Sequence, residues 1–373
     1  MRTTTVLFSD PESVEPRDMT INVEEPVLGE IHTGVGNLRG WAVADAGVDK
    51  IEIWIDDAYA FDVPYGGARG DVGAAFPDIA ESGNSGFSMA YSYSSLTPGT
   101  HTLKAVGYDS LIGLTTERET EFSVVKFDED FISDPNAINL DSAICSLTGD
   151  EIVLTDARVS EDMVDMTMKW RTAEQGFEII EIRQSGMPVA MNSPRLAANA
   201  LAATSEEEVF RVVLEEPVDG EIHSGVGNLR GWAVASDGIE KIQIYIDGGF
   251  AFETPYGGER SDVGAVFPDV PNSRDSGFSL AFTYSNLSAG SHVIEAVAYT
   301  RGGAEERSSS VFEVVKFSEN FISDPNAVNL DNAACITSGD ELKISNALVA
   351  GQTYQLKLDW RMAEQGFEIV EIR

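Results

Sequence analysis

The feature that most constrains this chain is an internal repeat. The run Gly34-Val-Gly-Asn-Leu-Arg-Gly-Trp-Ala-Val-Ala44 recurs unchanged at 225–235, and the wider segments 24–44 and 215–235 match at 19 of 21 positions. A repeat this close indicates two copies of one structural unit. Each copy is long enough to bury a core of its own, so the 373 residues predict at least two equivalent units.

Charge and hydropathy exclude several classes of partner. The chain has 62 acidic against 25 basic residues and a formal net charge of −37, spread along its length. Nucleic acid is excluded because binding phosphates requires clustered Lys and Arg. Membrane insertion is excluded because no apolar run approaches the roughly 20 residues that a spanning helix needs. No signal peptide is visible at the start of the chain. The charge predicts a solvated acidic surface.

Each repeat begins with short segments that alternate apolar and polar residues, the pattern of half-buried strands. Ile51, Ile53 and Ile55 share one face, and Asp56-Asp57 then reads as a hairpin turn. Seven such strands in about 105 residues predict an immunoglobulin-like β-sandwich. In the first repeat we expect them at 19–23, 38–44, 50–56, 58–63, 86–93, 101–108 and 119–127.

Two features of the sandwich carry further expectations. Trp41 and its copy Trp232 are expected in the core, on the opposite side of their strand from Ala42 and Ala233. Segments 65–85 and 256–276 have no periodicity and are expected to be long loops, the first place to look for a binding surface.

A second module follows each sandwich. Phe131–Asp141 and Phe321–Asp331 match at 10 of 11 positions, and a small antiparallel β-meander is expected after them, with strands at about 138–145, 151–157, 164–171 and 177–183 in the first copy. One face of this sheet is apolar. A lone sheet of about 55 residues buries little, so the adjacent sandwich, the other meander or another subunit must cover that face.

The predicted fold is therefore all-β, with two tandem repeats of sandwich plus meander. Its parts are an N-terminal extension at 1–23, sandwiches at 24–127 and 209–317, meanders at 128–183 and 318–373, and a linker at 184–208. The extension contains a lone strand, Thr3–Phe8, and the linker contains a short helix from Ser193 to Ala203.

Two cysteines, Cys145 and Cys335, occupy equivalent positions in the two meanders. Neither repeat can form an internal disulfide. A bond between the two requires a pseudo-twofold arrangement or a second chain that brings their Cα atoms within about 7 Å. We expect buried free thiols, because the surrounding pattern is that of a strand.

The sandwich carries a family resemblance in a set of short motifs. They are Gly40-Trp-Ala42, Ile51-Glu-Ile-Trp-Ile-Asp56, Arg69-Gly-Asp-Val72, Phe76-Pro77, Ser85-Gly-Phe87 and Pro98-Gly-Thr-His-Thr-Leu103. The chain thereby resembles the bacterial immunoglobulin-like (Big-type) domains of secreted and surface proteins, over about 24–127 and 215–317. The resemblance implies export, to the cell surface or the medium. It is weakly specific for function, because such domains serve as spacers, adhesive modules and accessory domains.

Several residues invite a functional interpretation. Arg69-Gly70-Asp71 resembles an adhesion tripeptide, but the second repeat reads Arg260-Ser-Asp262, so a structural Arg–Asp interaction is expected in each loop. The four histidines lack zinc-ligand spacing. No calcium motif occurs, although one weak calcium site stays open among the acidic clusters. Trp54, replaced by Tyr245, faces away from the isoleucines; it is expected to pack beneath the meander, with a sugar platform or an interface anchor as alternatives.

No catalytic motif or cofactor site is expected, because the motif-like residues are duplicated and no nucleophile elbow or phosphate loop occurs. The expected function is a non-enzymatic extracellular structural or adhesive protein of a bacterium. It would associate with itself or with other surface proteins, and could form a fibre through the meander faces and through Val6 and Phe8 of the N-terminal strand. A carbohydrate-binding accessory protein, with the long loops, Trp54 and Tyr245 as the glycan surface, is the alternative.

Overall fold

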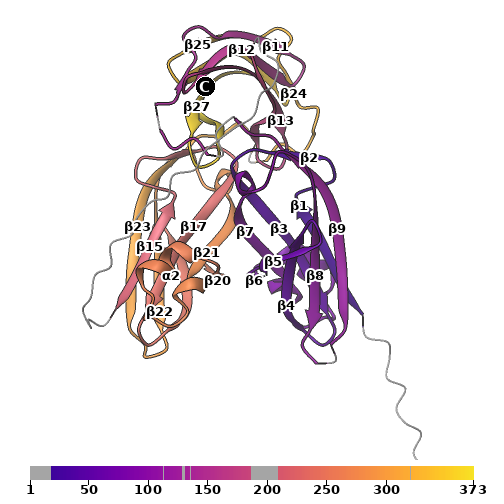
Figure 1. Ribbon diagram of the computed structural model, residues 1–373, viewed down its shortest axis with the longest axis vertical. Coiled ribbons are helices and arrows are strands. Elements are labelled where there is room, and N and C mark those ends of the chain that lie inside the picture. The colour runs from indigo at the N-terminus through magenta and orange to yellow at the C-terminus, as the bar shows by residue number, and fades with distance from the viewer. Residues whose placement is uncertain (1–17, 112, 128–130, 135, 186–208, 320) are drawn as a thin grey trace, which may run out of the picture.

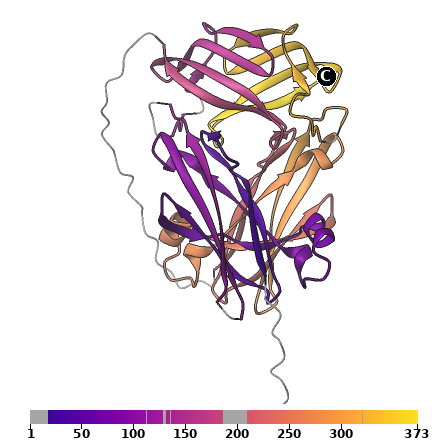
Figure 2. The ribbon, with the colours of Figure 1, turned by 90° about the vertical axis from the view of Figure 1, so that its right-hand side faces the viewer.

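The computed structural model describes residues 18–111, 113–127, 131–134, 136–185, 209–319 and 321–373. The described chain is all-β, as predicted. Each repeat folds into a two-sheet sandwich followed by an antiparallel sheet (Figure 1). The two sandwiches diverge from a shared cap as an inverted V, and Figure 2 shows that the meanders of both repeats form this cap. The predicted N-terminal strand and linker helix lie outside the described residues.

The first sandwich contains the seven predicted strands and two short additional ones. Asp56 and Asp57 form the predicted hairpin turn, with φ angles of 51° and 63°. The first strand starts at Met19, inside the segment predicted to be an extension. In spatial order, one sheet holds β1 (Met19–Glu25), β3 (Val35–Ala44), β7 (Gly86–Ser92) and β6 (Tyr65–Gly67). The other holds β2 (Glu30–His32), β9 (Thr115–Val124), β8 (Gly99–Asp109), β4 (Val48–Ile55) and β5 (Ala58–Asp62).

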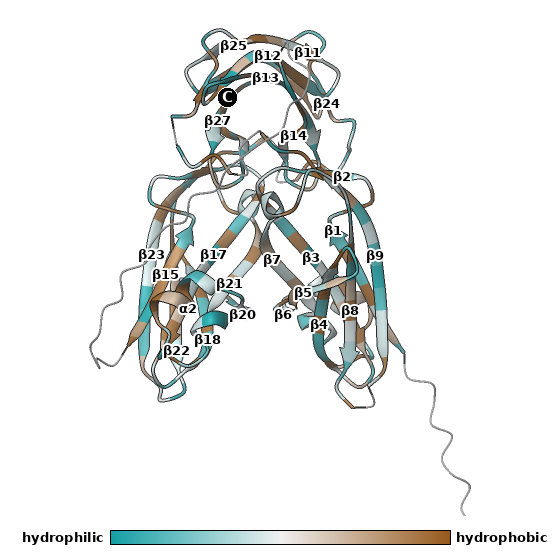
Figure 3. Cartoon of the chain, viewed as in Figure 1, coloured by the Kyte–Doolittle hydropathy of each residue, from teal (hydrophilic) through white to brown (hydrophobic). Residues whose placement is uncertain are grey.

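The second sandwich repeats this topology strand for strand. One sheet holds β15 (Phe210–Glu216), β17 (Val226–Ala235), β21 (Gly277–Thr283) and β20 (Tyr256–Gly258). The other holds β16 (Ile222–His223), β23 (Glu305–Val314), β22 (Gly290–Thr300), β18 (Ile239–Ile246) and β19 (Gly249–Thr254). Figure 3 shows the alternation of hydrophobic and hydrophilic segments along these strands, which gives each sandwich its own core.

The expected core position of Trp41 is wrong. Ala42 is fully buried between the sheets, whereas Trp41 lies on the outer face of β3, half-buried against Phe76 at a ring distance of 5.5 Å. The inner face has no room for a large side chain here, because a Cβ at Gly40 would lie 2.4 Å from the Phe87 ring and 2.1 Å from the Asn22 carbonyl oxygen. The tryptophan is therefore on the face that the long loop covers.

The long loops are built from short regular elements rather than being structureless. In the first repeat β6 is followed by α1 (Gly70–Ala75) and the 3₁₀ turn η1 (Ser82–Asn84), and in the second β20 is followed by α2 (Ser261–Val266) and η3 (Ser273–Asp275). Two further 3₁₀ turns, η2 (Tyr93–Ser95) and η4 (Tyr284–Asn286), end β7 and β21. A small apolar cluster of Val234, Val263 and Val270 fastens the second loop to its sandwich.

Each meander is a five-stranded sheet, because the first predicted strand is split into two. The first contains β10 (Ile138–Asn139), β11 (Ile144–Thr148), β12 (Glu151–Val159), β13 (Asp162–Arg171) and β14 (Gly176–Gln184). The second contains β24 (Val328–Asn329), β25 (Ala334–Ser338), β26 (Glu341–Val349), β27 (Gln352–Arg361) and β28 (Gly366–Ile372). One continuous hydrophobic core includes residues of both sheets, such as Met168 and Leu358. Of the three covers considered, the other repeat's meander is the one present.

The two meanders are related by a pseudo-twofold axis, as their reciprocal contacts show. Leu140 donates its backbone N–H to the Gly339 carbonyl oxygen at 2.5 Å, and Leu330 donates to that of Gly149 at 2.6 Å. The aromatic contacts also cross, since Trp170 packs on Phe317 from the second repeat and Trp360 packs on Phe127 from the first. Such reciprocity characterises a symmetric dimer interface, here within one chain.

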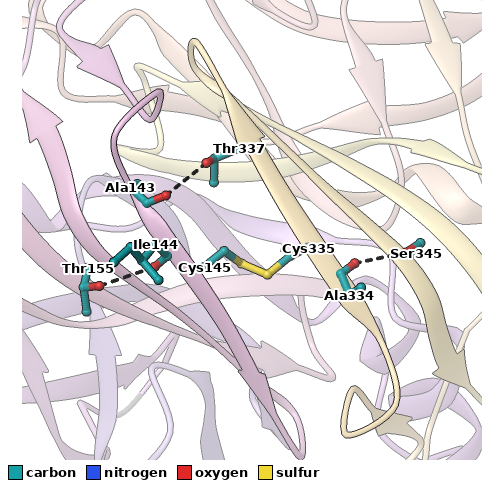
Figure 4. Close-up of a disulfide and its surroundings, with 8 residues drawn as sticks. All are labelled: Ala143, Ile144, Cys145, Thr155, Ala334, Cys335, Thr337 and Ser345. Atoms are coloured by element: carbon teal, nitrogen blue, oxygen red, sulfur yellow. Dashed lines mark hydrogen bonds between the residues drawn. A yellow bond between two sulfur atoms is a disulfide. The ribbon is translucent and has the colours of Figure 1, made fainter.

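The axis brings the two cysteines together, which corrects the expectation of free thiols. Cys145 on β11 and Cys335 on β25 form a disulfide with their Cα atoms 6.0 Å apart (Figure 4). The carbonyl oxygen of Ala143, two residues before Cys145, accepts a hydrogen bond from Thr337 at 3.2 Å. Neither cysteine is fully buried. The sequence indicated that this bond within one chain requires a pseudo-twofold arrangement. It did not show whether the two repeats adopt that arrangement.

Removing the disulfide should weaken the cap without unfolding it. The bond joins residues 190 positions apart, and the chain-entropy model gives about 5 kcal/mol as the upper bound for a loop of this length. We expect Cys145→Ser with Cys335→Ser to fold, because the shared core remains, and to unfold at a lower urea concentration than the oxidised protein. Wild type under reducing conditions is the matched control and should shift equally. An unchanged midpoint would contradict the cross-link.

Candidate functional site

The turns at the ends of the two meanders meet the sandwiches at the centre of the molecule. The turn at 172–175 joins β13 to β14, and the turn at 362–365 joins β27 to β28. Each accepts a backbone hydrogen bond from the sandwich of the opposite repeat. Val35 donates to the Ala363 carbonyl oxygen, and Val226 to that of Glu174, both at 3.1 Å. We call this meeting point the junction.

Glycine makes the close approach at the junction possible. A Cβ placed on Gly34 would lie 2.3 Å from the Glu364 carbonyl oxygen, and one placed on Gly225 would lie 2.2 Å from that of Glu174. Both distances are far below a normal contact, and the obstructing atom is backbone. These two glycines open the run of eleven residues that recurs unchanged, so the strongest sequence feature of the chain lies at the junction.

Each turn is also tied to the sandwich of its own repeat by a buried ion pair. Arg171 donates to the Glu30 carboxylate at 2.5 Å and to the Ile31 carbonyl oxygen at 2.8 Å. Arg361 bonds to Glu221 and to the Ile222 carbonyl oxygen in the same way. Arginine suits this role because its planar guanidinium offers several donors in a fixed geometry.

A histidine stands beside each of these ion pairs. The His32 ring stacks on Tyr93 with centroids 3.9 Å apart, and its Nε2 lies 3.6 Å from Glu30 Oε2. His223 stacks on Tyr284 at the same distance, with Glu221 at 3.5 Å. Both tyrosines are fully buried, so each histidine is held in place by packing.

Carboxyl groups outnumber guanidinium groups around the junction. A cavity of about 50 Å³ lies between the two repeats, which is room for a few water molecules or an ion. Around it we define the junction cluster as eight glutamates and four arginines: Glu25, Glu30, Glu174, Glu178, Glu216, Glu221, Glu364, Glu368, Arg39, Arg171, Arg230 and Arg361.

Burial and like charges perturb several of these carboxyl groups. Burial, followed by the charge of Glu368, raises the pKa of Glu178 well above its usual range. Burial and Glu364 raise the pKa of Glu368 to about 7. Burial and Glu174 likewise raise the pKa of Glu25, although Arg39 lies 2.9 Å from its carboxylate. Desolvation and repulsion both favour the neutral acid.

The carboxylates that bind Arg171 and Arg361 behave differently. Burial works against ionisation of Glu30, but His32 and Arg171 outweigh it and lower the pKa of the Glu30 carboxyl. The pKa of Glu221 is lowered for the same reason by His223 and Arg361. The junction cluster therefore contains ionised carboxylates in ion pairs beside carboxyl groups that resist ionisation.

Some buried acceptors in the cavity wall lack a donor. The side-chain Oδ1 atoms of Asn37 and Asn228 accept no hydrogen bond, and these residues are 7% and 3% exposed. Oε2 of Glu174 also has no partner. Among the residues that the structure describes, no three His, Cys, Asp or Glu side chains are placed to hold one metal ion.

A second candidate site is a groove between the two sandwiches. The sandwiches touch where β7 crosses β21, with the Ala90 N–H donating to Ser279 Oγ at 3.0 Å. Beside this crossing lies a groove of about 620 Å³. Arg69 and Asp71 line one wall, and Phe252 and Phe282 from the opposite repeat line the other. Its pseudo-symmetric counterpart, beside Arg260 and Asp262, measures about 330 Å³.

The predicted Arg–Asp interaction is present in both loops. Arg69 bonds to Asp71 at 2.6 Å and to Glu24 on β1 at 2.8 Å, and Arg260 bonds to Asp262 and Glu215 in the same way. The arginine lowers the pKa of the Asp71 carboxyl to about 2. The arginine of each loop therefore fastens that loop to its sandwich.

Trp54 and Tyr245 contact their own sheets. Trp54 packs edge-on against Tyr59, with centroids 5.8 Å apart, and Lys104 lies over its ring. Tyr245 pairs in the same way with Phe250. Neither residue belongs to the meander core or packs against it, so the expected position beneath the meander is wrong. Val6 and Phe8 lie outside the described residues.

Two of the four histidines, His101 and His292, each bond to an aspartate and to a backbone carbonyl oxygen. His101 donates or accepts through Nδ1 with Asp56 at 2.7 Å and bonds to the Thr97 carbonyl oxygen through Nε2 at 2.7 Å. His292 has an equivalent arrangement with Asp247. The acidic residues 128–130 lie outside the described residues.

Sequence reasoning missed the junction cluster. A signal was available, because Ala173-Glu-Gln-Gly-Phe-Glu-Ile179 recurs unchanged as Ala363-Glu-Gln-Gly-Phe-Glu-Ile369. This run carries four of the junction glutamates, two in each repeat, as well as Gln175 and Gln365. Each glutamine side chain bonds to the backbone of Ile322 or Ile132 in the other repeat. The alternation of apolar and polar residues alone predicts only that these glutamates lie on the exposed face of a strand.

The fold defines a protein with tandem immunoglobulin-like sandwiches, and the comparison with known families agrees. Residues 211–296 match the profile of the bacterial Ig domain family, Big_7. The second sandwich is thus a bacterial Ig-like domain, and the first repeats its sequence and topology. This confirms the resemblance expected from the motifs. The comparison with curated proteins gives no match.

The comparison with solved structures gives matches that are distant both in sequence and in overall structure. The fibronectin(III)-like modules of Clostridium thermocellum CbhA are 12% identical, over 80% of this chain and 95% of that chain, with a TM-score of 0.21. The N-terminal Ig1-2 module of Drosophila receptor protein tyrosine phosphatase DLAR is 8% identical, over 80% and 99%, with a TM-score of 0.23. At these TM-scores neither structure carries an argument about this chain.

Adding a methyl group at the junction should separate the turns from the sandwiches. We expect Gly34→Ala with Gly225→Ala to lower the free energy of unfolding by about 2 kcal/mol per site, the usual cost of overpacking, because each Cβ would overlap a backbone oxygen. Gly70→Ala is the matched control, since its Cβ would meet open space. Equal urea midpoints for the two proteins would contradict the close approach.

Proposed function

We propose that this chain is a non-enzymatic, exported structural or adhesive protein of a bacterium, which presents two Ig-like sandwiches as one rigid unit. The observation that carries the proposal is the doubled cap. Two meanders share one hydrophobic core and a disulfide, and their turns hold both sandwiches. Tandem Ig-like domains joined only by a linker would move independently, whereas here the arms of the V are fixed at one end.

The disulfide supports export, and the surface charge fits a protein that stays soluble. A disulfide persists in oxidising surroundings outside the cytoplasm. The excess of acidic residues provides a charged surface that keeps such a protein soluble. Within the described residues, no helix is both long and apolar enough to cross a membrane.

The structure narrows the ways in which the protein could assemble. The apolar faces of the meanders cover each other, so they are not the surfaces for assembly that the sequence suggested. The N-terminal strand around Val6 and Phe8 remains the candidate for self-association. Deletion tests should stop at Arg17, because β1 starts at Met19 and a longer truncation would damage the sandwich.

Location and assembly can be measured together. Protease treatment of intact cells of the source bacterium should remove the protein, whereas protection until lysis would contradict export. Full-length protein should show concentration-dependent association by light scattering and electron microscopy, and protein lacking residues 1–17 should remain monomeric. Equal association of both proteins would eliminate the N-terminal strand as the assembling element.

Carbohydrate binding is the second candidate, and the groove between the sandwiches favours it. The groove has the volume of a small-ligand site, and it combines aromatic side chains on one wall with charged hydrogen-bonding groups on the other. Binding on a glycan array that is lost in Phe252→Ala with Phe282→Ala, but kept in Trp54→Ala with Tyr245→Ala, would place the glycan in the groove. No binding by wild type would remove this candidate.

A further inference from the structure

The junction cluster has more hydrogen-bond acceptors than donors. Ionised carboxylates only accept, and the cluster contains eight glutamates but four arginines. The unpartnered oxygens of Asn37, Asn228 and Glu174 add to this excess. A protonated carboxyl group supplies a hydrogen-bond donor and also removes a negative charge. Protonation therefore reduces both the excess of acceptors and the excess of negative charge.

The pseudo-twofold axis increases the imbalance of charge, because it brings the two copies of one glutamate next to each other. β14 and β28 pack side by side, which sets Glu178 opposite Glu368. Glu178 also faces Glu174, Glu364 and Arg171. Glu368 faces the remaining groups around it, which are Glu364, Glu174, Glu221 and Arg361.

The outer members of the cluster face these turns from the sandwiches. Glu25 faces Glu174, Glu30 and Arg39, and Glu216 faces Glu364, Glu221 and Arg230. Glu174 faces Glu30, His32 and Arg171. Each arginine forms its ion pair with Glu25, Glu30, Glu216 or Glu221. Among the described residues, the four glutamates of the turns and strands feel the charges of Arg171 and Arg361 without an ion pair of their own.

We propose that the junction cluster is a proton-operated latch, which holds the two sandwiches against the cap while its carboxyl groups are protonated and releases them as these groups ionise. The turns that carry Glu174 and Glu364 are the same turns that accept the hydrogen bonds of Val226 and Val35. Repulsion between the ionised turns therefore acts on the backbone contacts that join the sandwiches to the cap. The shared core and the disulfide lie beyond the turns and keep the cap closed.

The direction of the pH effect follows from the raised pKa values. A carboxyl group whose folded-state pKa lies above its unfolded value stabilises the fold least when it is ionised. Stability falls as pH rises from the ordinary glutamate range, near 4.5, through the folded value, which for Glu368 is about 7. Glu30 and Glu221 act in the opposite direction, but only below their ordinary range. The latch is therefore closed near pH 5, where the two sandwiches form the rigid unit of the proposed function, and it is weakened by pH 8.

The protein offers a direct test by small-angle scattering and urea unfolding between pH 5 and pH 8, with EDTA present. Wild type should become more extended and less stable as pH rises. Glu178→Gln with Glu368→Gln should stay compact throughout, because an amide is a neutral donor in place of each acid. Glu119→Gln with Glu306→Gln, which neutralises one exposed glutamate in each repeat, should behave as wild type does.

A second measurement, on protein that keeps every glutamate of the junction cluster, guards against a Glu178/Glu368 variant that fails to fold. Unfolding at pH 6 should release protons, because the folded junction binds more of them. His101 and His292 also have raised pKa values, since hydrogen bonds to a backbone carbonyl and to aspartate outweigh their burial. The release should therefore persist in a His101→Gln, His292→Gln background. No release there, or pH profiles of the Glu178/Glu368 variant that match the control, would overturn the latch. So would compaction of wild type at pH 8 by Ca²⁺ with no response to pH in EDTA, which would indicate a cation site.

Discussion

A sheet with one apolar face is the constraint on which this structure depends. Each meander exposes a row of large side chains on one side, and its five strands are too few to curl and cover them. The second copy of the same sheet is the cover, and burying both faces at once produces the largest core in the molecule. The cap, the disulfide and the position of the sandwiches all follow from this one pairing.

Pairing identical surfaces has an electrostatic consequence. Residues close to a twofold axis meet their own copies, so apolar residues gain a matching partner whereas carboxylates gain a like charge. Apolar residues of both sheets share one core, whereas Glu178 and Glu368 meet as like charges. The arginines of the cluster form ion pairs with the glutamates of the sandwiches. The charges of the glutamates on the meander turns and strands must be neutralised by protons instead. The junction is thus both the point that fixes the two sandwiches and the point where charge is least balanced.

Much of the fold was predictable because its signals are local. Alternation located the seven main strands, and the Asp56-Asp57 turn was recognised from residue type alone. The error at Trp41 has a steric origin. Phe87 packs against Gly40, so the core face of β3 is the face of Gly40 and Ala42 and not that of Trp41. The Arg69–Asp71 pair was predictable for a similar local reason, because its two residues are neighbours in the chain. By contrast, Trp54 was placed wrongly because its environment depends on where the meander lies.

The sequence alone determined that the protein is a duplicated all-β chain, because repetition and period-two alternation are properties of neighbouring residues. It also determined that Cys145 and Cys335 are equivalent, and that the meanders need a cover. Only the tertiary structure decided that they cover each other, because three partners could bury the same apolar area. The disulfide, the junction glycines and the glutamate cluster follow from that choice. These features bring together residues about 190 positions apart in the chain. No local sequence pattern indicates which residues so far apart come into contact.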